Sequence, residues 1–467
     1  MNSLPQVRTL LEGRVIASND ASYDEARAVF YGGIDRRPAL IVQAKDGSDV
    51  SRVVSFARAS GLELAVRSGG HSLAGHGVSD GGVVLDLRAM KALSIDRAGR
   101  TAWAEAGLTA REYTNAAGVH GLATGFGDTG SVGIGGLTLG GGIGYLVRKH
   151  GLTIDDLLAA EVVTADGQLL RVDSDTHPDL FWGIRGGGGN LGVATRFQFR
   201  LHEVDTIVGG MLMLPATPEV VSSFVAEAES AREELSTIAT VMRAPPMPFL
   251  PTDVHGKPIV MAKLVFAGDA EAGEHAIAPF RSLAKPVVDM VKPMRYADIY
   301  PPGRADHPVA SLRTMFLETI DRSVSDTIAE HLQASTAQMG AIEIRVLGGA
   351  MARVSADATA FAHRRSRIMV NIAAMYADPG EAAVQDAWAD DFAGALRQGD
   401  GGAYVGFLAD EGEARVRAAY PGSTWERLAA VKDRYDPSNL FHLNQNVPPS
   451  KMDRAATPLR AAAAVER

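Results

Sequence analysis

The sequence predicts an α+β fold in which a domain of short strands and helices is followed by a second domain, an antiparallel sheet covered by helices on one face. The length of 467 residues suits two or three domains. Up to about residue 205, short strand-like runs alternate with short helices and glycine-rich stretches, whereas longer helical patterns alternate with strand-like pieces further on. We therefore expect domains at 1–205 and 206–415, a C-terminal segment at 416–450, and a loosely held tail at 451–467.

The elements of the first domain follow from short apolar runs and from residues that start helices or turns. Ser48 and Thr109 suit the N-caps of helices, and Asp166-Gly167 suits a hairpin turn. In chain order we expect strand 39–43, helix 48–60, strands 62–67 and 83–87, a hairpin of 92–96 and 102–106, helix 109–118, a hairpin of 158–164 and 168–172, helix 178–184 and strand 193–201.

The second domain shows longer periodic segments. Helical spacing of apolar residues predicts helices at 218–234 and 323–339. Strand-like runs predict strands at 259–266, 342–347 and 368–374. This order of elements favours an antiparallel sheet with helices on one face.

Composition excludes several classes of protein. The formal net charge of −9 argues against a surface for nucleic acid. The absence of cysteine excludes disulfides, thiolate metal sites, cysteine nucleophiles and any cysteinyl bond to a cofactor. The first residues lack the pattern of a signal peptide, and no stretch of 18 apolar residues occurs, so we expect a cytoplasmic protein without a membrane segment.

Glycine is concentrated in three segments of the first domain, 68–82, 125–144 and 186–192. Glycine allows positive φ and lets a ligand approach backbone N–H groups that a Cβ would block. Successive N–H groups in such loops form concave sites for anions. We therefore expect a large cofactor that carries phosphate, with loose surface loops as the alternative for any single segment.

Two common nucleotide folds do not fit the glycine pattern. No GxxxxGK[ST] sequence is present, which excludes a P-loop. Residues 187–192 match G-x-G-x-x-G, but the dinucleotide fold requires a strand before this motif and a helix after it. Here the expected helix comes before the motif and the expected strand after it, so we reject an NAD site.

Four ordered motifs resemble a known family. They are RSGGHS at 67–72, GSVGIGGLTLGGGIGYLVRKHGL at 130–152, DLFWGIRGGGGNLGVAT at 179–195 and YDPSNLFHLNQNVPP at 435–449. The set is similar to the FAD-linked oxidases of the vanillyl-alcohol oxidase and para-cresol methylhydroxylase (PCMH) superfamily, in the berberine-bridge-enzyme-like branch. The resemblance implies a two-part, PCMH-type FAD-binding domain formed by the N-terminal half and the C-terminal segment, with the substrate domain inserted between them.

The resemblance also implies where FAD binds. The loop 67–72 would hold the pyrophosphate, and His71 would form a covalent bond with the 8α-methyl group of the flavin. A neutral imidazole is a nucleophile suited to such a bond, although a structural histidine or a metal pair with His76 remains open from the residues alone. Further contacts with FAD are implied for Arg67, Ser68, Gly69, Gly70, Ser72, His76, Gly77, Thr129, Val132, Gly133, Gly135, Gly136, Gly142, Tyr145, Gly151, Leu152, Asp155, Gly192, Val193, Asn444 and Asn446.

Two of these positions refine the expected chemistry. Many members of the branch have a second bond, from a cysteine to flavin C6. Thr129 stands at that position here and the chain has no cysteine, so we expect FAD to be linked through His71 alone. Val132 stands where valine, in the family, permits oxygen to reach the flavin. This residue favours an oxidase, with a valine that simply suits a buried turn as the alternative.

The candidate catalytic residues are Glu343, Arg345, Tyr376 and Tyr404. Alternation along strand 342–347 places Glu343 and Arg345 on one face with Leu347. A relative carries a lysine and two carboxylates on the aligned strand, so its specificity is not transferred; the arginine suggests an anionic or polar substrate. An ordinary ion pair is the alternative. The resemblance places both tyrosines near the flavin, where a tyrosine could act as a base, with core packing as the alternative.

The resemblance implies an oxidoreductase that transfers a hydride from a carbon bearing an alcohol or amine to covalent FAD. Molecular oxygen would then reoxidise the flavin and give hydrogen peroxide. A dehydrogenase with another electron acceptor and a non-catalytic flavin-binding paralogue are the alternatives. The expected partners are a small-molecule substrate and oxygen, with no nucleic acid, membrane or metal, and the expected state is a monomer or homodimer.

Overall fold

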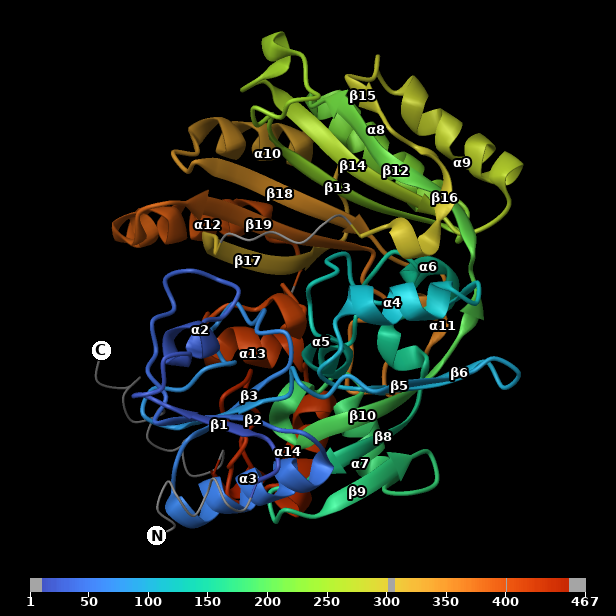
Figure 1. Ribbon diagram of the computed structural model, residues 1–467. Helices are drawn as coiled ribbons and strands as arrows, with labels where there is room; N and C mark the ends of the chain where they lie inside the picture. The colour runs from blue at the N-terminus through green and yellow to red at the C-terminus, as the bar shows by residue number, and fades with distance from the viewer. Residues whose placement is uncertain (1–10, 301–306, 400, 453–467) are drawn as a thin grey trace.

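The computed structural model describes residues 11–300, 307–399 and 401–452. It is a mixed α+β structure in which a large sheet forms the upper part of the molecule and smaller sheets form the lower part (Figure 1). The predicted α+β fold class is confirmed.

The lower part contains three sheets built from the first 203 residues. In one, β2 (Leu40–Gln43), β4 (Val83–Asp86) and β3 (Leu64–Arg67) are parallel, and β1 (Arg14–Ala17) pairs antiparallel with β2. An antiparallel sheet has the order β5 (Leu93–Asp96), β6 (Thr101–Glu105), β10 (Val193–Arg200), β8 (Leu157–Val163) and β9 (Leu169–Asp173). A small sheet pairs β7 (Leu122–Ala123) with β11 (His202–Glu203).

Short helices connect and cover these strands. They are α2 (Tyr23–Arg27), α3 (Gly47–Ser60), α4 (Ala110–Gly118), α5 (Ile134–Gly140), α6 (Val147–His150) and α7 (Pro178–Ile184), joined from the end of the chain by α13 (Glu413–Ala419) and α14 (Ser423–Tyr435). Figure 1 shows α13 and α14 beside strands of the first 200 residues. The two ends of the chain therefore share the lower part of the molecule.

The upper part is one antiparallel sheet. Its strand order is β15 (Val288–Asp289), β12 (Thr206–Pro215), β14 (Pro258–Phe266), β13 (Leu235–Arg243), β18 (Met339–Val346), β19 (Ile368–Tyr376) and β17 (Val309–Leu317), and β16 (Lys292–Arg295) also pairs with β12. The helices α8 (Pro218–Ser230), α9 (Ala270–Ser282), α10 (Arg322–Ala334) and α12 (Ala382–Leu396) cover one face. This arrangement is the predicted one.

Alternation along the strands gives the large sheet an outer and an inner face. On the outer face, Val241, Ile344 and Val370 pack in one core with Phe224 and Phe392 of the covering helices. On the inner face, Arg345 contacts residues of the lower part. The inner face therefore borders the lower part of the molecule.

Three predicted helix ends are wrong, and one of them belongs to the helix expected at 218–234, which stops at Ser230. The side chain of Asp46, not that of Ser48, caps α3, because its carboxylate accepts the N–H groups of Ser48 and Asp49. The helix expected to reach Met339 ends at Ala334, because Ser335 has extended backbone angles and Met339 begins β18. A helical spacing of apolar residues continues across this boundary and hides it.

The domain boundaries remain a proposal. Core packing indicates an earlier start for the C-terminal part than the predicted residue 416. Ala403 and Leu408 pack in the core of the lower part together with Leu428. We propose that the C-terminal part of the first domain begins near residue 403 rather than 416. Most of the predicted tail, from 453 onward, lies outside the described residues. Within the described residues, no helix has the length and apolarity needed to cross a membrane.

Candidate active site

Loops from distant parts of the chain surround one cavity in the lower part of the molecule. Its walls come from the loop after β3, the start of α5, the turn at η2 (Gly188–Asn190), and the segments 404–408 and 441–445. The predicted site residues that line this cavity are Arg67, Ser68, Gly69, Gly70, His71, Ser72, His76, Gly77, Val132, Gly133, Gly135, Gly136, Gly192, Val193, Tyr404 and Asn444.

The loop after β3 and the start of α5 touch through their backbones. A Cβ added to Gly133 would lie 2.2 Å from the backbone nitrogen of Gly69, so neither position has room for a side chain. Ser68 locks the two segments, since its hydroxyl donates to the carbonyl of Ala106 at 2.6 Å and accepts the N–H of Gly135 at 3.3 Å. A Cβ on Gly136, by contrast, would meet no atom within 4 Å. Gly136 therefore leaves open space beside the cavity.

His71 has a fixed ring and a neutral imidazole. Its ring stacks on that of Phe30, with centroids 3.9 Å apart and planes inclined by 20°. Burial lowers the pKa of His71 to about 4, although a hydrogen bond with the backbone of Ser131 acts in the opposite direction. Near neutral pH, one ring nitrogen therefore keeps its lone pair.

His76 lines the same cavity in a similar electrostatic state. Burial and then the nearby charge of Arg36 lower the pKa of His76 to about 4. Its backbone N–H donates to the hydroxyl of Ser72 at 3.2 Å. In the described part of the chain, neither this histidine nor His71 belongs to a group of three or more His, Asp or Glu side chains that could hold a metal ion.

Gly142 and Tyr404 form a contact behind the cavity wall. Gly142 has a φ of +78°, and its N–H donates to the hydroxyl of Tyr404 at 3.0 Å. A Cβ on Gly142 would lie 2.0 Å from the hydroxyl of Thr153, which makes glycine necessary there. Tyr404 precedes a short 3-10 helix, and burial raises its pKa. A neutral phenol that accepts a backbone N–H orients this wall and is poorly suited to be a base.

The predicted contacts Gly151, Leu152 and Asp155 lie outside the cavity. Arg364 binds both carboxylate oxygens of Asp155 at 2.8 Å, and the N–H of Leu152 donates to the same carboxylate. Gly151 turns the chain at this point with a φ of +95°. These residues hold the wall in place from behind.

The two predicted asparagines have different surroundings. Asn444 lines the cavity and donates to the carbonyls of Gly189 and Phe441, while its Oδ1 is buried without a partner among the described residues. Asn446 lies outside the lining and accepts from the buried ammonium of Lys432 at 3.1 Å. The prediction that Asn446 approaches the cofactor therefore finds no counterpart in the cavity.

Thr129 is also outside the cavity lining. It is exposed, and its hydroxyl donates to the carboxylate of Asp128 at 3.2 Å. Asp128 itself lines the cavity. Sequence reasoning missed this aspartate, although it is the single acidic residue in the glycine-rich stretch 125–144.

A charged cluster centred on Arg345 joins the inner face of the large sheet to the cavity. The guanidinium donates to Glu343 at 2.7 Å, to the carbonyl of Ile143 at 3.0 Å, and to the cavity-lining Asp128 at 2.8 Å. It also lies over the ring of Phe407, 5.0 Å from the centroid. Each nitrogen of the guanidinium thus has an acceptor, and two of the three acceptors come from the lower part of the molecule.

The pKa values of the two carboxylates in this cluster are shifted in opposite directions. Burial acts to raise the pKa of Asp128, but the opposing charges of Arg345 and Lys263 outweigh it and lower this pKa overall. Burial raises the pKa of Glu343, and the charge of Arg345 offsets only part of this effect, while Asp128 adds to it. Asp128 is therefore the permanent partner of the arginine, and Glu343 is the more basic carboxylate.

Lys263 and Tyr145 complete the cluster. The Lys263 ammonium donates to the Tyr145 hydroxyl at 3.2 Å, and this hydroxyl donates to the backbone carbonyl of Asp128 at 3.3 Å. Tyr145 was predicted as part of the cofactor wall; it instead connects the wall to β14. Lys263 was not predicted, although it is the single charged residue of an otherwise apolar strand.

Tyr376 does not join the other candidate catalytic residues. It shares the parity of Ile372 on β19, and Ile372 packs in the outer core, whereas Asn371 pairs with Glu343 on the inner face. The Tyr376 hydroxyl accepts from Ser311 at 3.4 Å. Its prediction as a catalytic residue conflicts with this placement, because a tyrosine on the outer face cannot reach the cavity.

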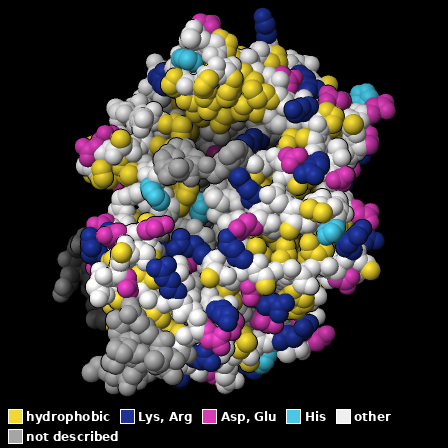
Figure 2. All heavy atoms as spheres, in the orientation of Figure 1, with side chains coloured by type: hydrophobic (Ala, Val, Ile, Leu, Met, Phe, Trp, Pro, Cys, Tyr) yellow, Lys and Arg dark blue, Asp and Glu magenta, His cyan; other side chains and the backbone are white. Residues whose placement is uncertain are grey.

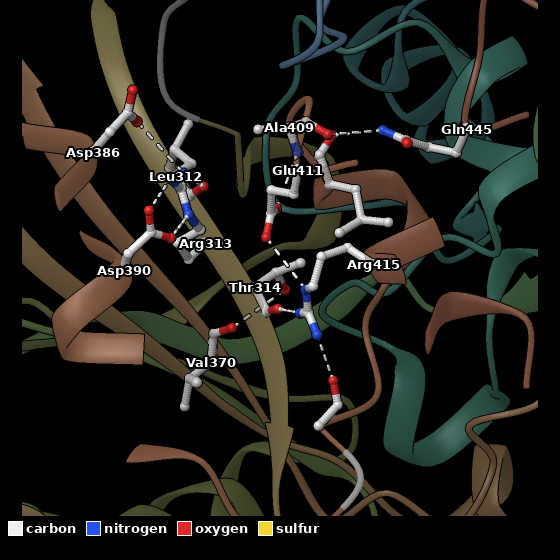
Figure 3. A network of polar contacts seen from close by, with 12 residues as sticks. Leu312, Arg313, Thr314, Val370, Asp386, Asp390, Ala409, Glu411, Arg415 and Gln445 are labelled. Carbon is white, nitrogen blue, oxygen red and sulfur yellow. Dashed lines mark hydrogen bonds and ion pairs between the residues drawn. The ribbon is translucent and has the colours of Figure 1, made fainter. Parts of the chain in front are cut away.

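A second polar network holds the segment 404–408 against the large sheet. Figure 3 shows Arg415 between Glu411 and the carbonyl of Thr314 on β17, at 3.3 and 2.5 Å. Gln445 donates to the carbonyl of Leu408 at 3.0 Å, and both residues line the cavity. This network fixes the C-terminal wall of the cavity relative to the sheet.

Comparisons with known proteins agree with this geometry. A family model described as "FAD binding domain" matches residues 38–173, and one described as "Berberine and berberine like" matches residues 403–448. The chain is 30% identical over 458 residues to (R)-6-hydroxynicotine oxidase of Paenarthrobacter nicotinovorans, which covers 94% of this chain and 97% of that protein. It is 26% identical over 473 residues to xylooligosaccharide oxidase of Thermothelomyces thermophilus, covering 94% and 93%.

Solved structures show the same fold. The crystal structure of 6-hydroxy-D-nicotine oxidase from Arthrobacter nicotinovorans superposes with a TM-score of 0.85 at 27% identity, covering 94% of this chain and 98% of that one. BBE-like 1 of Physcomitrella patens gives a TM-score of 0.86 at 21% identity, covering 96% and 99%. The chain therefore belongs to the FAD-linked oxidoreductases of the berberine-bridge-enzyme-like branch, within the vanillyl-alcohol oxidase and PCMH superfamily.

Proposed function

We propose that this enzyme is an oxidase that takes a hydride from a carbon bearing a hydroxyl or amine group and passes the electrons to dioxygen, giving hydrogen peroxide. One observation carries the proposal. His71 and Asp128 line the same cavity, and Asp128 holds Arg345, which in turn holds Glu343. A histidine suited to covalent attachment and a cluster suited to proton transfer therefore meet at one place.

The residues around the cavity fit FAD. The open space beside Gly136 is room that a side chain would occupy, and the loop after β3 offers backbone N–H groups of the kind that bind a pyrophosphate. At another part of the wall, the Oδ1 of Asn444, which has no partner in the described part of the chain, can accept a hydrogen bond from a ligand. When bound, FAD would accept two electrons from the substrate and pass them to oxygen.

We propose that His71 holds FAD by a covalent bond to the 8α carbon of the flavin. Burial keeps the imidazole neutral, and the stack on Phe30 fixes the plane of the ring. A neutral, oriented ring nitrogen is the form that can make such a bond. Because the chain has no cysteine, a second bond between a cysteine and the flavin cannot form.

We propose that Glu343 accepts the proton released from the substrate hydroxyl or ammonium. Its side chain is 22% exposed and one carboxylate oxygen accepts from Arg345, which leaves the other for substrate. A raised pKa makes this carboxylate a stronger base than an ordinary glutamate. Each nitrogen of Arg345 donates to the protein and the residue is only 3% exposed, so we assign it the positioning of Glu343 rather than the binding of an anionic substrate.

Covalent attachment is tested by acid precipitation. The wild-type pellet should stay yellow, and a tryptic peptide containing His71 should carry the mass of the flavin. His71→Ala should release the flavin into the supernatant, whereas His120→Ala, which changes an exposed histidine, should keep it in the pellet. Flavin that is fully extractable from the wild-type enzyme would disprove the bond.

The electron acceptor is tested separately. The enzyme is reduced without oxygen and then mixed with air-saturated buffer while flavin absorbance and hydrogen peroxide are followed. We expect reoxidation within seconds and about one peroxide per flavin. Reoxidation that takes many minutes in air but is fast with a quinone would replace the oxidase by a dehydrogenase.

A further inference from the structure

The inner face of the large sheet changes from charged to apolar along its strands. Antiparallel pairing arranges the side chains of this face in rows across the strands. The first row holds Lys263 and Arg345 on either side of Ile238. The next row, two residues further, holds Glu343 opposite Thr240. The charged groups of this face therefore stand at the end nearest the cavity.

Beyond Glu343 the rows on the described strands contain apolar side chains. Ala341 pairs with Met242 and with Ala373 in the third row, and Met339 pairs with Met375 in the fourth. Because a strand advances about 3.3 Å per residue, Met339 lies about 13 Å from Glu343 along β18. The apolar part of the face is therefore long enough for a molecule of two or three rings.

Methionine is the characteristic side chain of this face. Met211, Met261, Met339 and Met375 are half-buried, so part of each thioether side chain remains accessible. Methionine is flexible and polarisable, and it fits irregular apolar ligands better than branched side chains do. Figure 2 shows a broad hydrophobic patch in the upper half of the molecule with a hollow directly below it. Met261 and Met339 pack in part against a small apolar core that includes Met242 and Leu250, and the rest of their surface is open to a ligand.

Beyond the charged row of Lys263 and Arg345, polar recognition on the described strands of this face is confined to the row of Glu343. Thr240 and Asn371 stand in the row of Glu343, and Asn371 has a buried, unpartnered Oδ1 among the described residues. A sugar presents hydroxyl groups along its whole length, and each one loses hydrogen bonds to water when it is placed against apolar side chains. The face therefore matches a molecule that is polar at one end.

We propose that the substrate is an elongated, mainly apolar molecule of two or three rings, with its hydroxyl or amine carbon at Glu343 and its rings against Met261, Met339 and Met375. This inference rests on the proposed function, because it assigns the substrate class of the same site. Such a substrate differs in class from the oligosaccharide that gives the relative xylooligosaccharide oxidase its name.

The test uses the FAD-loaded enzyme without oxygen. Benzyl alcohol, 4-phenylbenzyl alcohol and cellobiose are titrated while the loss of flavin absorbance is followed. We expect 4-phenylbenzyl alcohol to give the lowest apparent Kd, about tenfold or more below that of benzyl alcohol, because the second ring adds buried apolar surface. Cellobiose should leave the flavin oxidised. Reduction by cellobiose with a lower apparent Kd than that of 4-phenylbenzyl alcohol would overturn the proposal.

Binding is also measured without turnover. Biphenyl-4-carboxamide has no oxidisable carbon, and its binding is followed through the perturbation of the flavin spectrum. Met261→Gln and Met375→Gln should each raise its Kd by about tenfold. Met452→Gln, an exposed position near the end of the described chain, should leave it unchanged. Unchanged Kd values in both face variants would overturn the proposal.

Flavin reduction tests the proposed function, and binding of the carboxamide tests the apolar face. Tight binding of the carboxamide together with no reduction by any alcohol or amine would disprove the proposed function and support the apolar face. Reduction of the flavin by small polar alcohols together with no binding of the carboxamide would support the function and disprove the apolar face.

Discussion

The two walls of this site are built from different parts of the polypeptide. The lower wall is formed by backbone, where Gly69 and Gly133 approach too closely for any side chain. The upper wall is formed by side chains such as Glu343, Arg345 and Met261, which stand on strands already hydrogen-bonded to their neighbours. A change in the lower wall therefore disturbs the shape of the loops, whereas a change in the upper wall alters one contact at a time.

The largest effect is expected at Glu343. If this carboxylate is the base, Glu343→Gln should lower the limiting rate of flavin reduction by about 10²–10⁴-fold, because an amide cannot accept the proton. Flavin content should stay normal, since the lower wall is untouched. Stopped-flow reduction measures the rate, and Glu330→Gln, an exposed change on α10, is the control. A loss of less than threefold would exclude Glu343 as the base.

The pH dependence sharpens the same assignment. A base acts in its deprotonated form, so the rate of reduction should rise with pH and level off above the pKa of Glu343. Burial raises that pKa above its ordinary value of 4.5, so the midpoint should lie above 4.5. Stopped-flow rates between pH 4 and 9 measure it. The rise should disappear in Glu343→Gln; a profile identical to that of the wild type would assign it to another group.

Arg345 tests how far the upper wall depends on its charges. Arg345→Met leaves Asp128 and Glu343 close together without their shared cation, which should cost about 3–5 kcal/mol of unfolding free energy. The double variant Asp128→Asn, Arg345→Met should recover part of this loss. Denaturant unfolding measures both, and equal stability of the wild type and Arg345→Met would show that the cluster contributes little.

The lower wall is tested by a pair of glycines. Gly133→Ala should destabilise the fold by about 1–3 kcal/mol, because its Cβ would lie 2.2 Å from the Gly69 nitrogen. Gly136→Ala meets no protein atom within 4 Å, so the apoprotein should keep its stability. FAD content should fall in both. Thermal unfolding and flavin content separate the cases, and full flavin content in Gly136→Ala would show that FAD does not approach this position.

The smallest effect concerns Lys432 behind the C-terminal wall. Burial lowers its pKa to about 8 in the folded protein, against 10.5 in the unfolded chain. Between these values the unfolded chain binds the extra proton, so this residue should make stability increase as pH rises from 8 to 10.5. Lys432→Met should remove that increment. Unfolding midpoints at pH 7.5 and 10 measure the difference, which a parallel dependence in both proteins would contradict.

The backbone wall could be predicted from sequence because glycine itself is the signal. Loops that need positive φ or close approach leave glycines at fixed positions, and Gly69, Gly133 and Gly136 all line the cavity. The prediction failed where a motif residue faces away from the cavity. Leu152 belongs to the motif at 130–152, but its N–H donates to Asp155 behind the wall. Sequence order does not show which side of a wall a residue occupies.

The side-chain wall could be predicted only in part. Alternation correctly paired Glu343 with Arg345, since both stand on one strand. The resemblance placed Tyr376 near the flavin, whereas its register on β19 puts it on the outer face of the sheet. Asp128 and Lys263 come from separate elements, and their meeting with Arg345 depends on strand register and on the packing of the two parts. These relations are long-range and leave no local pattern.

The hydrogen-bonded ladder beneath Met261, Met339 and Met375 has a practical consequence for directed evolution. These side chains stand on three different strands, and the pairing of β14, β18 and β19 involves main-chain atoms alone. Randomising the three codons together should therefore keep a large share of the library folded while varying the shape of the face. New activities in this enzyme would then be sought by screening a few positions of one sheet, with the flavin loops left unchanged.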